Sequence, residues 1–163
     1  ANWLVGTWTT KWDGKVTWPT VPKMTYGEHL TIEPAVYSYS AKVYLLNYTS
    51  STWSFSDKDR FLDTYGIISI DWEGNVVFMS VGGNGFSTIE RSTEPIEYGS
   101  LKLESQDVLR IKIAREIPVV KVVREYSLLS PDRLQHLLYM RTIQHPRQEG
   151  MLLHSNVTYT KQY

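Results

Sequence analysis

The feature of this chain that most constrains its fold is a long series of short β-rich runs separated by turn residues. Helical periodicity is nearly absent, whereas Val, Ile, Thr, Tyr and Trp recur in each run. The polar segment 49–59 is predicted to be a loop, and Pro19 and Pro22 exclude a regular central strand over 16–24. Strands are predicted over residues 6–12, 26–33, 35–48, 63–71, 75–81, 86–92, 98–104, 108–115, 119–129, 134–144 and 151–161, with 98–104 and 108–115 as a pair.

About ten consecutive antiparallel strands with short connections form a meander, which must either close on itself or split into two sheets. Closure removes the exposed strand edges that such a chain would otherwise have to protect. We therefore predict an all-β protein, an up-and-down antiparallel barrel of about ten strands, forming a single domain over residues 1–163. A barrel of this size leaves room inside for one small ligand.

Composition excludes several classes of function. Seventeen basic and seventeen acidic side chains cancel, so no broad electrostatic field favours nucleic acid or an acidic membrane surface. The absence of cysteine excludes disulfides, thiolate metal sites and cysteine nucleophiles. No apolar run approaches the ~20 residues that cross a bilayer, and no signal-peptide pattern opens the chain. We expect a soluble, cytoplasmic protein that binds neither nucleic acid nor membrane.

Common catalytic and metal-binding motifs are missing. The four histidines, His29, His136, His145 and His154, do not have the spacing of a zinc site. There is no Gly-x-Ser-x-Gly motif, and the glycine-rich segment 82–85 precedes no helix, so it is interpreted as a hairpin turn rather than a phosphate loop.

Basic residues alternate with aliphatic ones near the middle of the chain, at Arg110, Lys112, Arg115, Lys121 and Arg124. This pattern is typical of the solvated face of two strands. The alternative is a basic rim that binds the carboxylates of an acidic ligand at the barrel mouth.

His154, in the last predicted strand, has two interpretations. Imidazole is a common axial ligand of heme iron, but most isolated strand histidines are surface or core residues. In a regular strand, His154 would share a face with Leu152 and Asn156, while Leu153 and Val157 would occupy the other. Neither face is clearly the apolar one, so alternation leaves the direction of His154 open.

Several short motifs occur in a characteristic order: Trp3-Leu-x-Gly6-Thr7-Trp8, Pro19-Thr20, Tyr26-x-Glu28, Gly66, Phe78-x-Ser80 followed by Gly85, Met140-x-Thr142, and His154-x-x-Val-Thr-Tyr-x-Lys161. In this order and spacing they resemble the nitrobindin family, which includes the heme-binding C-terminal domain of certain THAP proteins. The resemblance covers nearly the whole chain.

The resemblance implies a ten-stranded antiparallel barrel, similar in plan to fatty-acid-binding proteins, that holds ferric (Fe3+) heme b at one end. It implies that His154 is the proximal iron ligand, that Thr20 contacts the heme and that Met140 lines the pocket. Members of the family bind nitric oxide and are reported to isomerise peroxynitrite to nitrate. The implied partners are therefore heme and a small diatomic ligand or peroxynitrite, and a homodimer stays open.

The chain departs from the family at one motif. The family's Gly-x-Trp-x-Gly-x-Gly is here Gly6-Thr-Trp8-Thr-Thr10-Lys-Trp12, with side chains in place of two glycines. Those glycines allow strand curvature or close approach, so the pocket is expected to differ in shape at this corner. Two alternatives to a heme protein stay open: a non-enzymatic carrier of a fatty acid or another small hydrophobic ligand, and a barrel that serves only as an interaction module.

Overall fold

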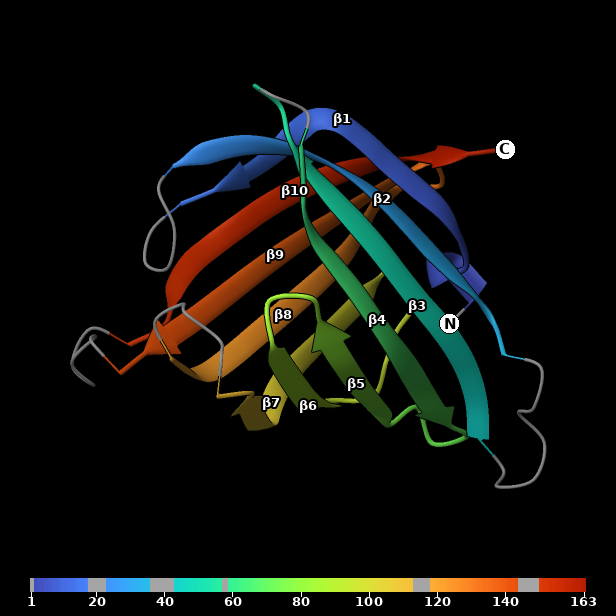
Figure 1. Cartoon of the computed structure of the whole chain (residues 1–163). Coiled ribbons are helices and arrows are strands. Elements are labelled where there is room, and N and C mark those ends of the chain that lie inside the picture. The colour runs from blue at the N-terminus through green and yellow to red at the C-terminus, as the bar shows by residue number, and fades with distance from the viewer. Residues whose placement is uncertain (1, 18–22, 36–42, 57–58, 113–117, 144–149) are drawn as a thin grey trace.

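The computed structural model of the protein describes residues 2–17, 23–35, 43–56, 59–112, 118–143 and 150–163. A short 3-10 helix, η1 (Asn2–Leu4), precedes ten strands (Figure 1). The strands are β1 (Gly6–Val16), β2 (Met24–Pro34), β3 (Val43–Ser54), β4 (Arg60–Asp71), β5 (Val76–Gly82), β6 (Phe86–Ser92), β7 (Ser100–Arg110), β8 (Val119–Ser130), β9 (Arg133–Thr142) and β10 (Leu152–Gln162). Within the described ranges, no helix is long and apolar enough to span a membrane.

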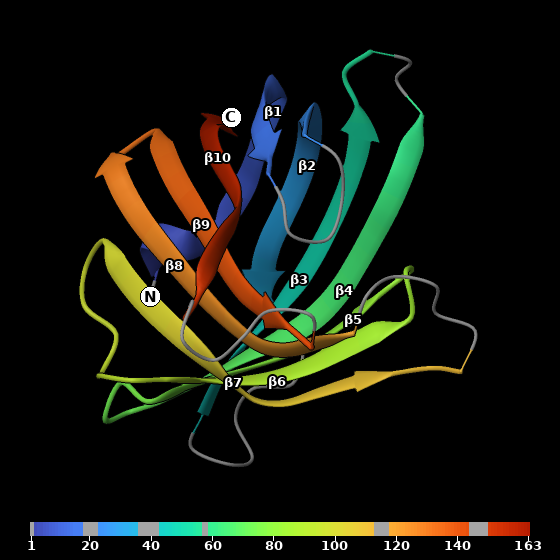
Figure 2. The same ribbon diagram turned by 90° about the vertical axis from the view of Figure 1, so that its left-hand side faces the viewer.

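The strands form one closed barrel. Each strand pairs antiparallel with its neighbours in sequence, and β1 pairs with both β2 and β10, which closes the sheet. Figure 2 shows the first and last strands side by side. The predicted all-β, up-and-down antiparallel barrel of about ten strands is confirmed. Closure leaves no strand edge of the barrel without a neighbour.

Two predictions about the strands, a loop over 49–59 and a pair of strands over 98–115, are wrong. The expected loop over 49–59 is largely strand, because β3 continues to Ser54, and its polar residues Ser50 and Thr52 are buried inside the barrel. The expected pair 98–104 and 108–115 contains one strand, β7, over the described residues. Gln106 is an extra residue in its pairing with β6 and forms a bulge, which interrupts the alternation that predicted two strands.

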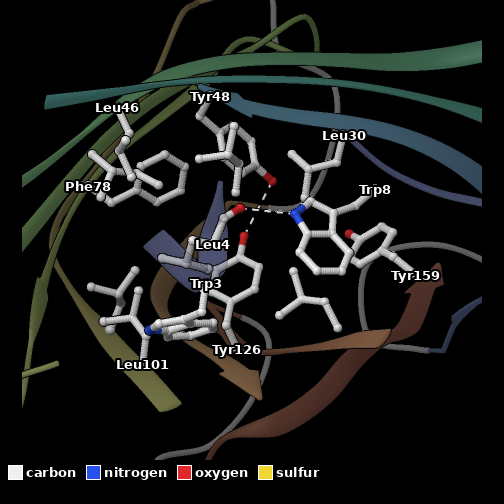
Figure 3. Packing of buried hydrophobic residues seen from close by; sticks show 14 of the residues in the cluster. Trp3, Leu4, Trp8, Leu30, Leu46, Tyr48, Phe78, Leu101, Tyr126 and Tyr159 are labelled. Atoms are coloured by element: carbon white, nitrogen blue, oxygen red, sulfur yellow. Dashed lines mark hydrogen bonds between the residues drawn. The ribbon is translucent and has the colours of Figure 1, made fainter. Parts of the chain in front are cut away.

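The inward-facing side chains change character along the barrel. On β2, Tyr26 and Glu28 face the interior near one end, and Leu30 and Ile32 fill the other end. Trp3 and Leu4 of η1 enter this apolar end, where Leu4 accepts a hydrogen bond of 2.9 Å from the Trp8 indole N–H (Figure 3). One end of the barrel is therefore a packed core, and the other end is left for a cavity.

The part of β1 in which two family glycines are replaced contains a bulge. The pairing of β1 shifts between Thr10 and Gly14, and Thr10 Oγ1 accepts a 2.9 Å hydrogen bond from the Asp13 backbone N–H. The Trp12 side chain is 60% exposed, so it occupies none of the interior. The strand bends here through a bulge, which does not require glycine at either replaced position.

Gly66 in β4 allows a close approach between strands. A Cβ atom at this position would lie 2.6 Å from the Met79 carbonyl oxygen and 2.7 Å from the Phe78 ring. Because the carbonyl belongs to the sheet backbone, it cannot move aside cheaply, and we expect Gly66→Ala to cost about 1–3 kcal/mol of unfolding free energy. Urea denaturation measures this. In the control, Gly83→Ala, the nearest atom is 3.6 Å away, and equal losses in the two variants would contradict the packing argument.

Candidate functional site

The open half of the barrel holds a cavity of about 200 Å³. His154 and Met140, two of the predicted site residues, both line it, while Thr20 lies outside the described residues. One part of the lining is apolar and includes Val16, Phe86, Val108, Val119, Val122 and Leu138. The other part is polar and includes Glu28, Ser50, Ser80, Thr88, Arg124 and His136.

His154 reaches the cavity because β10 contains a bulge. Leu153 pairs with Tyr139 and Ser155 pairs with Leu138, so His154 is an extra residue in the ladder. His154 and Ser155 consequently both line the cavity although they are adjacent in sequence. The expectation that His154 shares a face with Leu152 agrees with the structure, because Leu152 pairs with Met140, which lines the cavity. The expectation is wrong for Asn156, because the bulge at His154 shifts the alternation by one residue.

The backbone of His154 is fixed from the side of β1. Its carbonyl oxygen accepts a 2.7 Å hydrogen bond from the Thr17 backbone N–H, and the Thr17 hydroxyl donates to the Leu153 carbonyl at 2.8 Å. Burial lowers the pKa of the His154 side chain to about 4. At neutral pH the imidazole is therefore uncharged, which is the form that coordinates a metal.

The low pKa of His154 makes the stability of the heme-free protein depend on pH. The imidazole has an ordinary pKa of 6.5 in the unfolded chain, so the unfolded chain binds more protons between pH 6.5 and about 4. The uncharged imidazole therefore adds about 3 kcal/mol to the unfolding free energy. This stabilisation is complete above pH 6.5 and is lost as the pH falls toward 4. Relative to His154→Gln, we expect the wild type to lose that much unfolding free energy on acidification.

Urea denaturation across this pH range measures the effect, and His29→Gln is the matched control. His29 lies on an exposed face of β2, so this variant should follow the wild type at every pH. Parallel stability curves for the wild type and His154→Gln would show that the His154 imidazole is not held in a buried, uncharged state.

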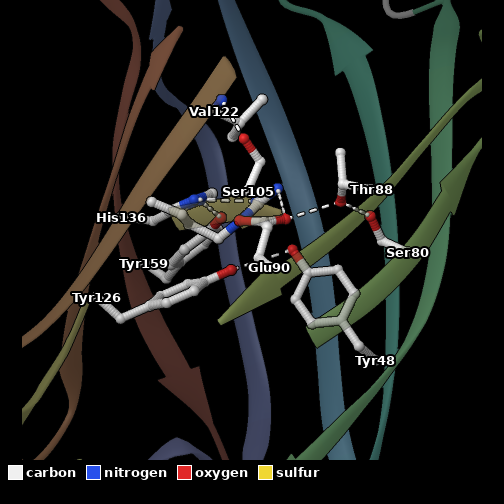
Figure 4. Close-up of polar contacts among 10 residues, drawn as sticks. Tyr48, Ser80, Thr88, Glu90, Ser105, Val122, Tyr126, His136 and Tyr159 are labelled. Atoms are coloured by element: carbon white, nitrogen blue, oxygen red, sulfur yellow. Dashed lines mark hydrogen bonds and ion pairs between the residues drawn. The ribbon is translucent and has the colours of Figure 1, made fainter. Parts of the chain in front are cut away.

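A buried ion pair forms the centre of the polar part of the cavity (Figure 4). The Arg124 guanidinium donates from Nε to Glu90 Oε1 at 3.0 Å and from a terminal nitrogen to Oε2 at 3.2 Å. The Glu90 side chain is fully buried, and Thr88 donates a further hydrogen bond of 2.8 Å to it. Ser80 and Thr88 are hydrogen-bonded at 2.8 Å. The two opposite charges are therefore paired bidentately and shielded from water.

A second branch of hydrogen bonds leads from Arg124 to Glu28. Arginine only donates hydrogen bonds, so His136 Nε2, which lies 3.2 Å from an Arg124 terminal nitrogen, must accept. The ring proton of His136 is therefore assigned to Nδ1, which lies 3.5 Å from the Tyr159 hydroxyl oxygen. The Tyr159 and Ser50 hydroxyls both bond to the Glu28 carboxyl. Burial raises the pKa of Glu28 and, together with the Arg124 charge, lowers that of His136 well below its ordinary value. Burial thus favours the uncharged form of both groups.

The position of Arg124 differs from the interpretation of the basic residues as one solvated face. Lys121 is on the outside, where it pairs with Glu104 at 3.9 Å, whereas Arg124 is inside the barrel. The two are three residues apart and so lie on opposite faces of β8. Arg110 and Lys112 are exposed, and Arg115 lies outside the described residues. The prediction of one solvated basic face is therefore wrong for Arg124.

The polar interior is not evident from the sequence. Glu28, Glu90 and His136 are not predicted as site residues, and Arg124 is predicted only as part of a possible basic rim. In the structure Glu28, Arg124 and His136 line the cavity, and Glu90 is buried against Arg124. A weak signal was present: Glu28 and Leu30 are two residues apart and so must share a strand face. That pattern places a carboxyl on the same side as a core residue.

Comparisons with known proteins agree with this architecture. A family model described as a THAP4-like, heme-binding beta-barrel domain matches residues 1–161. The crystal structure of Rv2717c from M. tuberculosis superposes with a TM-score of 0.80 at 20% identity and covers 99% of this chain and 94% of that one. This superposition shows that the two proteins share the fold.

Curated relatives match over most of the chain. The protein C28H8.5 of Caenorhabditis elegans is 31% identical over 99% of this chain and 55% of its own length. Human peroxynitrite isomerase THAP4 is 26% identical over 98% of this chain and 26% of its own length. An Arabidopsis thaliana protein named peroxynitrite isomerase Rv2717c is 25% identical over 90% of this chain and 80% of its own length. The chain thus spans about half of the worm protein and a quarter of the human one.

The family model covers nearly all of the chain, the worm relative is 31% identical over 99% of it, and the barrel has the fold of Rv2717c. The chain belongs to the THAP4-like, heme-binding β-barrel family, the nitrobindins.

Proposed function

We propose that this chain binds one ferric heme b through His154, and that the loaded protein binds nitric oxide and isomerises peroxynitrite to nitrate. The observation that carries the proposal is the bulge that directs the uncharged imidazole of His154 into the cavity of a heme-family barrel. The names of the human and Arabidopsis relatives supply the reaction.

The residues at the cavity fit a heme with one axial histidine. His154 supplies a neutral nitrogen donor from the cavity wall. Both ring nitrogens of His136, the other described histidine in the lining, contact Arg124 and Tyr159. Met140 and the neighbouring valines supply an apolar wall for a porphyrin face. A second hollow of about 590 Å³ also has Val16 in its lining.

Bound heme would supply a Lewis-acidic, redox-active iron with a coordination position open to a small ligand. The chain's own residues would hold that group and set its surroundings. His154 would provide the nitrogen that binds iron, Met140 would form part of the apolar wall, and the barrel would limit access of water. Glu90 neutralises Arg124, and burial raises the pKa of Glu28, which favours its uncharged form. Both effects reduce the charge that an anionic product would meet in the described lining.

Heme titration of the purified protein tests the proposal. We expect a Soret band that saturates at one heme per chain, followed by faster peroxynitrite decay and a higher yield of nitrate than in buffer. Nitric oxide should shift the Soret band. Failure to take up heme would refute the proposed function, and uptake without faster decay of peroxynitrite would refute the isomerase activity.

The fatty-acid carrier receives less support from the interior. A buried carboxylate needs a positive partner, and Arg124 is already paired bidentately with Glu90. A fatty acid would add an uncompensated negative charge to this cavity. We therefore expect oleate not to displace heme at equal concentration, which a competition titration followed at the Soret band measures.

A further inference from the structure

Tyr26 crosses the inner surface of β1 to reach the strand that carries His154. It belongs to β2, and its pairing partner on β1 is Gly14. A Cβ atom on Gly14 would lie 2.6 Å from both Cε2 and Cζ of the Tyr26 ring. The hydroxyl end of the ring therefore occupies the place that a side chain at position 14 would take.

On the far side of β1 lies the bulge of β10. Val16 pairs with Ser155 and Lys15 pairs with Asn156, so Gly14 separates Tyr26 from this part of β10. The Ser155 side chain bonds to the Tyr26 hydroxyl, and both residues are almost fully buried in the cavity wall. Tyr26 thus reaches the residue that immediately follows His154.

The ring of Tyr26 is also held from its other side. Phe61 packs edge-on against it, with ring centroids 6.3 Å apart and an interplanar angle of 85°. Gly14, Phe61 and Ser155 together leave the Tyr26 ring little freedom. A rigid side chain of this kind can fix the conformation of a neighbouring bulge.

We propose that Tyr26, which packs over Gly14 and is hydrogen-bonded to the Ser155 side chain, positions the His154 imidazole in the cavity. This inference rests on the proposed function, because the imidazole it positions is the proposed iron ligand. Tyr26 acts through Ser155 and the β10 bulge and is a positioning residue. Groups that orient a metal ligand typically change metal affinity by about 10–100-fold when removed.

The test compares Tyr26→Phe and Ser155→Ala with Tyr126→Phe. Tyr126 is a similarly buried tyrosine outside the cavity lining, and its hydroxyl donates to the Tyr48 hydroxyl at 3.4 Å. We expect Tyr26→Phe and Ser155→Ala each to weaken heme binding by about 10-fold and to shift the iron–histidine stretching band of the ferrous protein. The double variant should lose no more than either single variant, and Tyr126→Phe should match the wild type.

A second measurement needs no heme. In the heme-free protein, nuclear Overhauser contacts report where the His154 ring lies relative to the other cavity-lining side chains. We expect Tyr26→Phe and Ser155→Ala to change these contacts and Tyr126→Phe to preserve them. Unchanged contacts in all three variants, or equal effects of Tyr26→Phe and Tyr126→Phe on heme binding, would overturn the inference. Wild-type protein that takes up no heme would instead refute the proposed function.

Discussion

Replacing Glu90 by Gln is expected to destabilise the protein by about 3–5 kcal/mol, because it leaves the Arg124 charge buried without a counter-charge. In the folded protein the Glu90 side chain is fully buried and that of Arg124 is 11% exposed, so water cannot take over the lost interaction. The Phe78 ring, whose centroid lies 5.1 Å from the guanidinium carbon, compensates only in part. Chemical denaturation of the heme-free protein measures the loss.

An ion pair on the outside of the barrel gives the matched control. Lys102 and Glu125 pair across β7 and β8 at 3.7 Å, with side chains 52% and 33% exposed. Glu125→Gln removes the same charge in water and should cost less than about 1 kcal/mol. The double replacement Glu90→Leu with Arg124→Met removes both buried charges and should recover most of the stability lost in Glu90→Gln. Similar losses for Glu90→Gln and Glu125→Gln would contradict the role of burial.

The barrel could be predicted because local sequence carries the information that defines it. Turn residues such as those over 71–75 separate the strands, and Asp71 accepts hydrogen bonds from the backbone N–H groups of Glu73 and Asn75 in the turn between β4 and β5. Short connections then favour antiparallel neighbours, and closure follows from the number of strands. These steps do not require knowledge of distant contacts.

The polar interior could not be predicted in the same way. Alternation assumes that polar residues face water, but Ser50 and Thr52 face the cavity, so their segment of β3 was interpreted as a loop. Arg124 is inside because Glu90, more than thirty residues earlier, supplies its counter-charge. Such pairing depends on which strands become neighbours, and the local pattern does not contain that information.

The orientation of His154 depends on one extra residue. A bulge reverses the alternation of every residue beyond it, and nothing in the sequence from 151 to 161 marks its position. The residues alone therefore left the direction open, and the family resemblance supplied the iron-ligand hypothesis. The structure places the side chain in the cavity wall, while its role as an iron ligand stays a prediction.

Replacing His154 by Ala is expected to lower heme affinity by at least about 100-fold, because removing a ligand should cost more than removing a group that orients it. The apolar wall around Met140 still favours a porphyrin, so weak binding with an altered Soret band should persist. Transfer of heme to apomyoglobin measures the affinity. His29→Ala on the exposed face of β2 is the control and should retain the affinity of the wild type.

The central claim, that the His154 imidazole ligates heme iron, is tested most directly by imidazole rescue of His154→Gly. The visible spectrum of this variant loaded with ferric heme should differ from that of the wild type, and added imidazole should restore the wild-type spectrum by filling the vacated position. If a residue other than His154 were the iron ligand, that ligand would still be present in His154→Gly, and added imidazole would have no vacated position to fill. A His154→Gly protein that binds heme with the wild-type spectrum and affinity before imidazole is added would contradict the account.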